Sequence, residues 1–402
     1  MIRSTVLSLL VICFLQPAMG LNSDKPVQCP LSSFHTDLDP KEDPQMFAWA
    51  LFAYVNQSVP NTESGPTVLW ETWASPRDLY CSKDRTNCDP DNNPQWPAFK
   101  GHALNLGPIT QIEMLANSNA VMPSPDTAPG VSLVGQELRM NCPTFKHISD
   151  NNLWYLEGQE KAFESGKEVV FPIDAIEIKA YWISVDEDVK SRYHWQKVGS
   201  RYYGLVSLSI TSRVLPRWFW ATFEHVDNPN RCIAPKTCRE YTSGSGNIDP
   251  GVASKVRSVL RGNGLTEPWW LNYRLDGTQF TFTDENGLPT VLANSIFESL
   301  LISRTSNTSS CITCHARATV DYQGNRLCAG RDNTGNVGEP LRAWYCDSSG
   351  HMKFLPLGFV WSLREAQSIH STVDENPKKC DNHAPIRVTG PQCVSIPFLA
   401  IN

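Results

Sequence analysis

The sequence predicts an α+β protein, in which a β-rich N-terminal body precedes a C-terminal segment of helices and loops, with disulfides stapling the whole. Three observations lead to this prediction. Apolar and polar residues alternate with a period of two within residues 165–226, whereas helical patterns lie before and after that stretch. Twelve cysteines follow an N-terminal export signal. The chain of 402 residues is 41% hydrophobic and 19% charged, which is typical of a globular protein.

Length and charge narrow the class further. We expect two domains, a body over 21–285 and a C-terminal segment over 286–402. The 35 basic and 41 acidic residues give a net charge of −6, without the basic excess that is typical of nucleic-acid binders. The composition also excludes a disordered, collagen-like or coiled-coil chain.

Residues 1–20 have the pattern of a secretory signal peptide. Arg3 precedes an apolar run over residues 6–15, and residues 18–20 (Ala-Met-Gly) supply the small side chains of a cleavage site. The alternative is a membrane anchor, but this run is shorter than the hydrocarbon core requires. We therefore expect export to the periplasm, where paired thiols form disulfides. Cys81 with Cys88, and Cys232 with Cys238, are spaced to close small loops, although sequence alone does not fix the connectivity.

The body begins with a helix and a loop-rich stretch. Asp43 and Pro44 are the cap and first residue of a helix over 45–55, which is apolar on all sides and therefore buried. In the loops that follow, residues 88–93 (Cys-Asp-Pro-Asp-Asn-Asn) carry the oxygen ligands of a calcium loop. They lack its glycine and its distant glutamate, which favours a disulfide-closed turn.

An antiparallel sheet with one packed face is predicted next. Residues 176–182 alternate as a half-buried strand, and further strands are expected over 203–210 and 218–225. Asp249 and Pro250 then begin a helix that ends near residue 260.

His225 and Glu224 are weak catalytic candidates at the end of the third strand. A histidine between Glu224 and Asp227 has the surroundings of a general base or of a metal ligand. No nucleophile or second histidine stands at a recognisable spacing, so a structural role is the competing interpretation. The 13 tryptophans allow an aromatic platform for sugars, although burial is their commoner fate.

One motif carries specific chemistry: Cys311-Ile312-Thr313-Cys314-His315. C-x-x-C-H is the signature of covalent haem attachment, because two thiols three residues apart reach the two vinyl groups on one porphyrin edge. The adjacent His315 is then the proximal iron ligand. Ser309 or Ser310 is expected to cap a short helix that continues to Ala318. Two alternatives stay open: ordinary disulfides at Cys311 and Cys314, or a zinc site that also uses His315 or Cys328.

The distal iron ligand is less determined. Met352 is the only methionine after the motif and is the leading candidate, since a methionine ligand raises the potential and suits electron transfer. Its rivals are His351, His370, His383, Met114, Met122 and Met140. Arginines outnumber acids within 301–345 and are candidates for binding haem propionates or for steering an acidic redox partner; they are Arg304, Arg317, Arg326, Arg331 and Arg342.

The order of elements after residue 290 resembles a small cytochrome c domain. An expected helix over 294–303, the motif, a loop with Met352 and an expected helix over 359–366 carry the resemblance, while the irregular stretch 320–350 departs from it. The whole layout also resembles a group of bacterial secreted proteins with a single haem. The further residues that carry this second resemblance run from Trp220 to Pro229 (Trp-Ala-Thr-Phe-Glu-His-Val-Asp-Asn-Pro).

The second resemblance implies a periplasmic protein with a single haem and supplies no activity. We expect one covalent haem c, and the leading hypothesis for its function is transfer of single electrons to or from a small redox protein. One alternative is a haem-dependent oxidoreductase with a substrate pocket near His225. Another is a haem-free, disulfide-stapled binding module.

Overall fold

The computed structural model confirms the α+β fold, with a mixed-length antiparallel sheet and helices on both sides of it. The described residues are 29, 33–59, 66–82, 86–98, 133–228, 241–242, 250–294, 309–327, 337–370, 391 and 393. The predicted signal peptide, the Cys232–Cys238 loop and the predicted helix over 294–303 lie outside these residues, apart from Asn294 itself.

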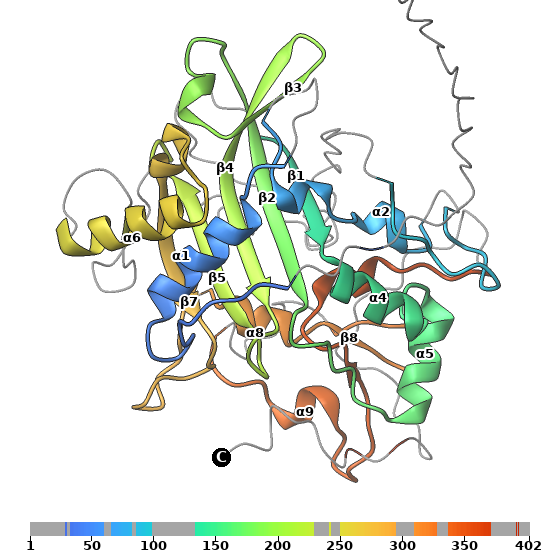
Figure 1. Ribbon diagram of the computed structural model, residues 1–402. Helices are drawn as coiled ribbons and strands as arrows, with labels where there is room; N and C mark the ends of the chain where they lie inside the picture. Colours follow the sequence, from blue (N-terminus) through green and yellow to red (C-terminus); the bar gives the residue numbers. More distant parts are fainter. Residues whose placement is uncertain are drawn as a thin grey trace, which may run out of the picture.

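The central sheet has seven strands in the order β1-β2-β4-β5-β7-β6, with β3 pairing against β4 (Figure 1). All of its described pairings are antiparallel. The three strands predicted from the alternation correspond to β2, β4 and β5. The strands are β1 (Leu133–Met140), β2 (Ile176–Val185), β3 (Trp195–Val198), β4 (Arg201–Ser212), β5 (Phe219–His225), β6 (Tyr241–Thr242) and β7 (Tyr273–Gln279).

Helix α1 (Pro44–Val55) covers one face of the sheet. Its cap is the predicted one, since the side chain of Asp43 accepts a hydrogen bond from the backbone N–H of Met46. Every residue from 46 to 55 is buried, which confirms the prediction of a helix that is apolar on all sides. Phe47 packs on Phe219 of β5, and Trp49 packs on Phe223, with ring centroids 4.8 and 5.0 Å apart.

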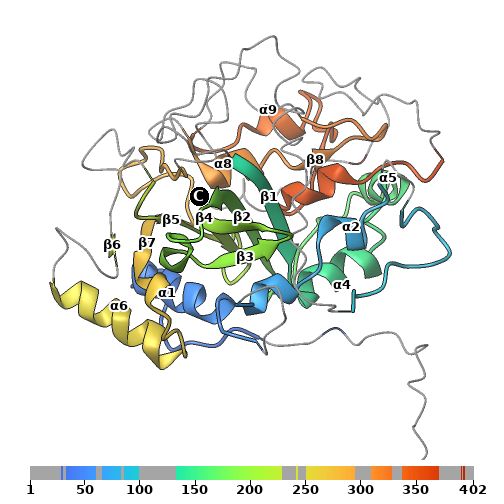
Figure 2. The ribbon, with the colours of Figure 1, turned by 90° about the horizontal axis from the view of Figure 1, so that it is seen from above.

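Strand β2 is not half-buried as predicted, because both faces of the sheet are covered. Glu177, Lys179 and Tyr181 were expected on the exposed side of this strand, yet Glu177 and Tyr181 are buried and Lys179 is half-buried. Figure 2 gives the reason: α1 lies on one side of the sheet, and the C-terminal elements α8 and α9 lie on the other.

The remaining helices frame the sheet. Helix α6 agrees with the helix predicted after Asp249, and η5 replaces the longer helix predicted over 359–366. The described helices other than α1 are η1 (Leu69–Thr72), α2 (Pro76–Leu79), α4 (Cys142–Asp150), α5 (Leu156–Ser165), η2 (Lys190–Arg192), α6 (Pro250–Gly262), η3 (Pro268–Asn272), α8 (Cys311–His315), α9 (Arg342–Tyr345) and η5 (Trp361–Glu365). None of the helices in the described part is long and apolar enough to span a bilayer.

One hydrophobic core joins the two predicted segments, whereas each described disulfide lies within one segment. Among the described residues, disulfides link Cys29 with Cys142, Cys81 with Cys88, and Cys346 with Cys393, so the predicted small loop at 81–88 is confirmed. A single core cluster extends from α1 through the sheet to the C-terminal segment. The latter also holds a two-stranded sheet of β8 (Thr319–Val320) and β9 (Leu355–Pro356).

Candidate functional site

The C-x-x-C-H motif forms the short helix α8, which is docked on the sheet. Ser310 is its N-cap, as predicted, and accepts a hydrogen bond from the N–H of Thr313. The helix ends at His315 instead of continuing to Ala318. Gln279 at the end of β7 binds the start of the helix: its Nε2 donates to the Ser310 Oγ at 2.9 Å, and its Oε1 accepts from the Ile312 N–H at 3.0 Å. The sheet therefore fixes the position of the motif.

The two motif thiols lie outside the disulfides that the structure describes. Cys311 and Cys314 are both partly exposed, and neither belongs to one of the three described bridges. The thiol of Cys311 donates a weak hydrogen bond to the carbonyl oxygen of Leu292 at 3.4 Å. Separated by one helical turn, the two sulfurs are presented from the same short element.

His315 is held by the chain in one orientation. Its Nδ1 lies 2.9 Å from the backbone carbonyl oxygen of Phe359. Because a carbonyl oxygen only accepts hydrogen bonds, Nδ1 carries the proton and Nε2 carries the lone pair. Within the described part of the chain, Nε2 has no hydrogen-bond partner. This is the tautomer in which an imidazole binds a metal through Nε2 while a second partner orients the ring.

Aromatic side chains surround the His315 imidazole. The rings of Trp220 on β5 and of Trp361 in η5 lie 4.5 and 5.9 Å from it, centroid to centroid. Burial lowers the pKa of His315 to about 4; the hydrogen bond to Phe359 opposes this shift, and the positive charge of Lys179 adds to it. The imidazole is therefore neutral at ordinary pH, which is the form that ligates metals.

The donor set fits a covalently attached haem. Two accessible thiols and a neutral, oriented imidazole stand on one short helix in the order that attachment requires. A zinc site needs three or four protein ligands. No group of three or more His, Cys, Asp or Glu side chains in the described residues has that arrangement, and Cys328 lies outside them.

Met352 lies in the same C-terminal segment as the motif but is not brought into contact with His315 by the described residues. Its side chain is buried in the core, and its backbone forms an isolated β-bridge with Cys346. Its rival His351 lies 3.5 Å from the carboxylate of Asp347. Met140 is buried on β1, His370 is exposed, and the rivals Met114, Met122 and His383 lie outside the described residues.

The arginines near the motif divide into buried and exposed ones. Arg317 is buried with its guanidinium 3.8 Å from the ring centre of Trp344. Arg326 is buried and donates to the carbonyl oxygens of Thr319 and Leu363, and burial lowers its pKa to about 9. Arg342 is exposed on α9, whereas Arg304 and Arg331 lie outside the described residues.

His225 occupies a buried, fully bonded position far from the motif. Its Nε2 donates to the carbonyl oxygen of Arg192 at 3.0 Å, its Nδ1 accepts from the N–H of Asp227 at 3.2 Å, and its ring stacks on Tyr193. Burial lowers its pKa to about 4. It stands five positions after Trp220 along β5, a span of about 17 Å. The structure therefore gives His225 a packing role.

Glu224, the second weak catalytic candidate, faces the opposite side of β5. Its carboxylate lies 3.4 Å from the guanidinium of Arg274 and accepts a hydrogen bond from the amide of Asn228. Across the strands it pairs with Ser207 of β4. It shares this sheet face with Thr222 and Trp220, and so with the residue that contacts His315.

Sequence reasoning did not find Gln279, Lys179 or Trp220 as residues of the site. Their signal is the alternation itself, since Lys179, Trp220 and Gln279 all fall on the face of the sheet opposite to α1. Polar residues such as Lys179 and Gln279 on one face of the strands, with apolar residues on the other face, predict that another segment packs on the polar face. Its partner segment was not identifiable from the sequence.

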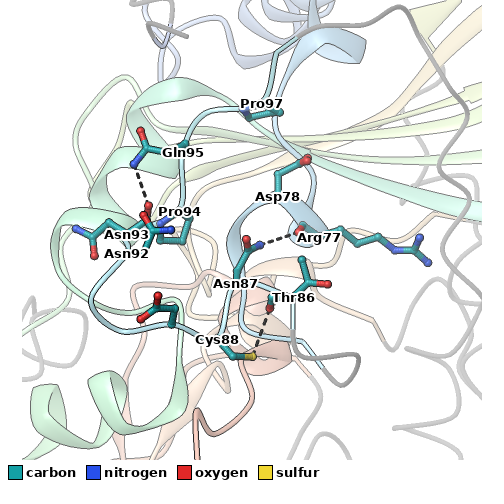
Figure 3. Close-up of a pocket in the computed structure, with 11 residues that line it drawn as sticks. Arg77, Asp78, Thr86, Asn87, Cys88, Asn92, Asn93, Pro94, Gln95 and Pro97 are labelled. Atoms are coloured by element: carbon teal, nitrogen blue, oxygen red, sulfur yellow. Dashed lines mark hydrogen bonds between the residues drawn. The ribbon is translucent and has the colours of Figure 1, made fainter. Parts of the chain in front are cut away.

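A separate polar cavity of about 670 Å³ lies beside α2 (Figure 3). Its lining comes from α2 and the loop over 86–97, and it includes Asp89 and Asn92 of the segment considered as a calcium loop. The carboxylate of Asp78 already accepts hydrogen bonds from the N–H and hydroxyl of Ser75. The disulfide between Cys81 and Cys88 closes residues 81–88, and the segment considered as a calcium loop begins where that closed loop ends.

Comparison of the chain with protein-family models, with curated proteins and with solved structures found no match. The functional argument therefore depends on the motif and on its geometry.

Proposed function

We propose that this protein is a periplasmic c-type cytochrome with a single haem, which carries single electrons to or from a small redox protein. Cys311 and Cys314 would hold the haem by thioether bonds, and His315 would bind its iron from the proximal side. A bound haem supplies a one-electron couple. The chain's own residues orient the imidazole, exclude water from it and keep it neutral.

The observation that carries this proposal is the orientation of His315. The Phe359 carbonyl holds the proton on Nδ1, and the Trp220 and Trp361 rings lie on its flanks. A histidine that was incidental beside two disulfide cysteines would not need a tautomer fixed for ligation through Nε2. The three described disulfides also show that this chain pairs other cysteines while the two motif thiols stay outside those bridges.

Electron exchange with a partner needs a route from the site to the surface. Trp361 provides one, because its ring contacts His315 and is only partly buried. The guanidinium of Arg364 lies 4.3 Å from the centre of that ring. A positive charge at this position favours an acidic redox partner. Met352 is the proposed distal ligand, and its replacement by alanine should lower the potential.

The experiment is production in a host that attaches haem, followed by acid-acetone extraction. The proposal predicts sharp absorbance bands of reduced haem that stay with the protein, and their loss in Cys311→Ser, Cys314→Ser and His315→Ala. His35→Gln, an exposed histidine far along the chain from the motif, is the matched control and should keep the bands. Extraction of all haem from the wild type would refute covalent attachment, and the absence of haem would favour the haem-free binding module.

The oxidoreductase alternative receives no support at His225, because both ring nitrogens are already bonded. Carbon monoxide distinguishes the remaining possibilities. Slow or absent binding to the reduced protein indicates a sixth ligand and electron transfer, whereas rapid binding indicates an open iron site.

A further inference from the structure

A tight turn over residues 357–360, between β9 and η5, supplies the carbonyl oxygen that orients His315. The N–H of Val360 closes this turn by donating to the carbonyl oxygen of Leu357 at 3.1 Å. Both central residues have a positive φ, 60° at Gly358 and 69° at Phe359, as in a type I′ turn. We call these four residues the His315 turn.

Phe359 is an unusual residue for its place in the His315 turn. Type I′ turns take glycine, asparagine or aspartate at their centre, and a bulky side chain with a positive φ is strained. Such strain persists where the surrounding structure imposes it, and it is concentrated at functional sites. The direction of a carbonyl group depends on the backbone angles of its own residue. The positive φ of Phe359 therefore contributes to aiming its oxygen at His315.

Trp218, just before β5, binds the neighbouring carbonyl of the same turn. Its indole Nε1–H donates to the carbonyl oxygen of Gly358 at 2.9 Å. Trp218 is 1% exposed, and its ring packs on Phe171 with centroids 5.6 Å apart. It also has a positive φ, 63°, which is again strained for a bulky residue. A second strained aromatic residue thus holds the peptide group next to the first.

The His315 turn is tightly packed and is tied to the motif segment. A Cβ atom on Gly358 would lie 2.7 Å from the carbonyl oxygen of Val169, so the backbone of the turn approaches its neighbour as closely as glycine allows. At the start of the turn, the N–H of Leu357 donates to the carbonyl oxygen of Ala318 at 2.7 Å. These contacts leave the turn one position relative to α8.

The segment that begins with Trp218 also contacts the histidine itself. The ring of Trp220 packs against the imidazole of His315, with centroids 4.5 Å apart. One stretch of chain therefore restrains both the imidazole and the turn that accepts its Nδ1–H. A backbone carbonyl held at this position fixes the tautomer of a ligating histidine and raises the basicity of its other ring nitrogen.

We propose that Trp218 is a positioning residue for His315, and that it acts through the His315 turn. By holding the carbonyl of Gly358, Trp218 keeps the Phe359 oxygen in place, so that the proton stays on Nδ1 and the lone pair on Nε2. A more basic Nε2 is a stronger electron donor to iron and lowers the potential. The effect on the potential rests on the proposed function, whereas the effect on the tautomer does not.

The first measurement uses the full chain without haem, with Cys311 and Cys314 both replaced by serine. Heteronuclear NMR of isotope-labelled histidines reports which ring nitrogen carries the proton, and the signals that vanish in His315→Gln belong to His315. The Nδ1–H tautomer is expected to dominate. Trp218→Phe keeps an aromatic ring but removes the indole donor. It should raise the ratio of Nε2–H to Nδ1–H roughly two- to tenfold, which corresponds to one hydrogen bond.

Trp154→Phe is the matched control. Trp154 is 0% exposed, and its Nε1 makes no hydrogen bond among the described residues. The same change of volume in the core therefore removes no donor contact. This variant should keep the tautomer ratio of the wild type.

The second measurement is the midpoint potential of the haem-loaded protein. Trp218→Phe should raise the potential, because a weaker hydrogen bond at Nδ1 makes the imidazole of His315 a weaker donor, and Trp154→Phe should leave it unchanged. Should the serine variant fail to fold, the potentials of these two variants decide.

The proposal is overturned if Trp218→Phe leaves the tautomer ratio and the potential unchanged, or if Trp154→Phe changes them equally. A shifted tautomer ratio in Trp218→Phe, in a protein whose wild type attaches no haem, would support the positioning role and refute the proposed function. Attached haem with neither shift would support the proposed function and refute the positioning role.

Discussion

Replacement of Gln279 by methionine tests how the sheet holds the C-x-x-C-H helix. Methionine has a similar volume but cannot form the hydrogen bonds of the amide, so the change isolates polar docking from packing. In the wild type the amide accepts from the Ile312 N–H at 3.0 Å and donates to the hydroxyls of Ser310 and Thr290 at 2.9 and 2.8 Å.

The cost follows from what each partner retains. Ile312 is fully buried near the start of α8, and its N–H would be left without a partner, at about 1–3 kcal/mol. The two hydroxyls keep other hydrogen bonds, so each loss costs about 0.5–1.5 kcal/mol. We expect Gln279→Met to lower the free energy of unfolding by about 3 kcal/mol.

The assay is reversible unfolding in urea with the disulfides intact, analysed by linear extrapolation. Gln323→Met is the matched control, since Gln323 is exposed, and its free energy of unfolding should stay within about 0.5 kcal/mol of the wild type. A loss below about 1 kcal/mol in Gln279→Met would refute the assigned docking of the helix on β7.

Three further predictions concern the disulfides, a buried acid and His225. Replacing both cysteines of Cys29–Cys142 by alanine should lower the free energy of unfolding by about 5 kcal/mol, and the same change in Cys81–Cys88 should lower it by about 2 kcal/mol. The first disulfide joins residues 113 apart and the second joins residues 7 apart, and the longer loop restrains the unfolded chain more. Equal midpoints of unfolding in urea for the two variants would contradict this. Burial raises the pKa of Glu177 from 4.5 to about 7, so the folded chain binds its proton more tightly, and stability is lost as pH rises through this window. Glu177→Gln should therefore gain about 3 kcal/mol relative to the wild type between pH 4.5 and 7, and parallel stability profiles would argue against it. His225→Gln should lower the free energy of unfolding by about 2 kcal/mol, because the ring stack and hydrogen bonds are lost, and should leave haem attachment intact. An unchanged free energy of unfolding in urea together with the loss of the haem bands would indicate a role for His225 at the C-x-x-C-H site.

The sequence was most informative where local chemistry decides the structure. The Asp43-Pro44 start predicts α1, the alternation predicts β2, β4 and β5, and Ser310 caps the motif helix as expected. These signals depend on neighbouring residues and need no knowledge of distant contacts.

Features that depend on long-range packing were not predictable. The Phe359 carbonyl lies 44 residues from His315 along the chain, and no local pattern relates the two. Glu177 was expected on a half-exposed strand but is buried, because the C-terminal segment covers the second face of the sheet. His225 resembles a general base in sequence, yet within the fold its ring nitrogens are bonded to the Arg192 carbonyl, 33 residues away, and to the N–H of Asp227.

The intact mass of the mature protein, purified from a haem-attaching host, tests the central claim most directly. The account predicts the mass of the polypeptide plus one haem, and the loss of that added mass when Cys311 and Cys314 are both replaced by serine. A wild-type mass equal to that of the polypeptide alone, with both motif sulfurs found in cystine bridges by peptide mapping, would contradict it.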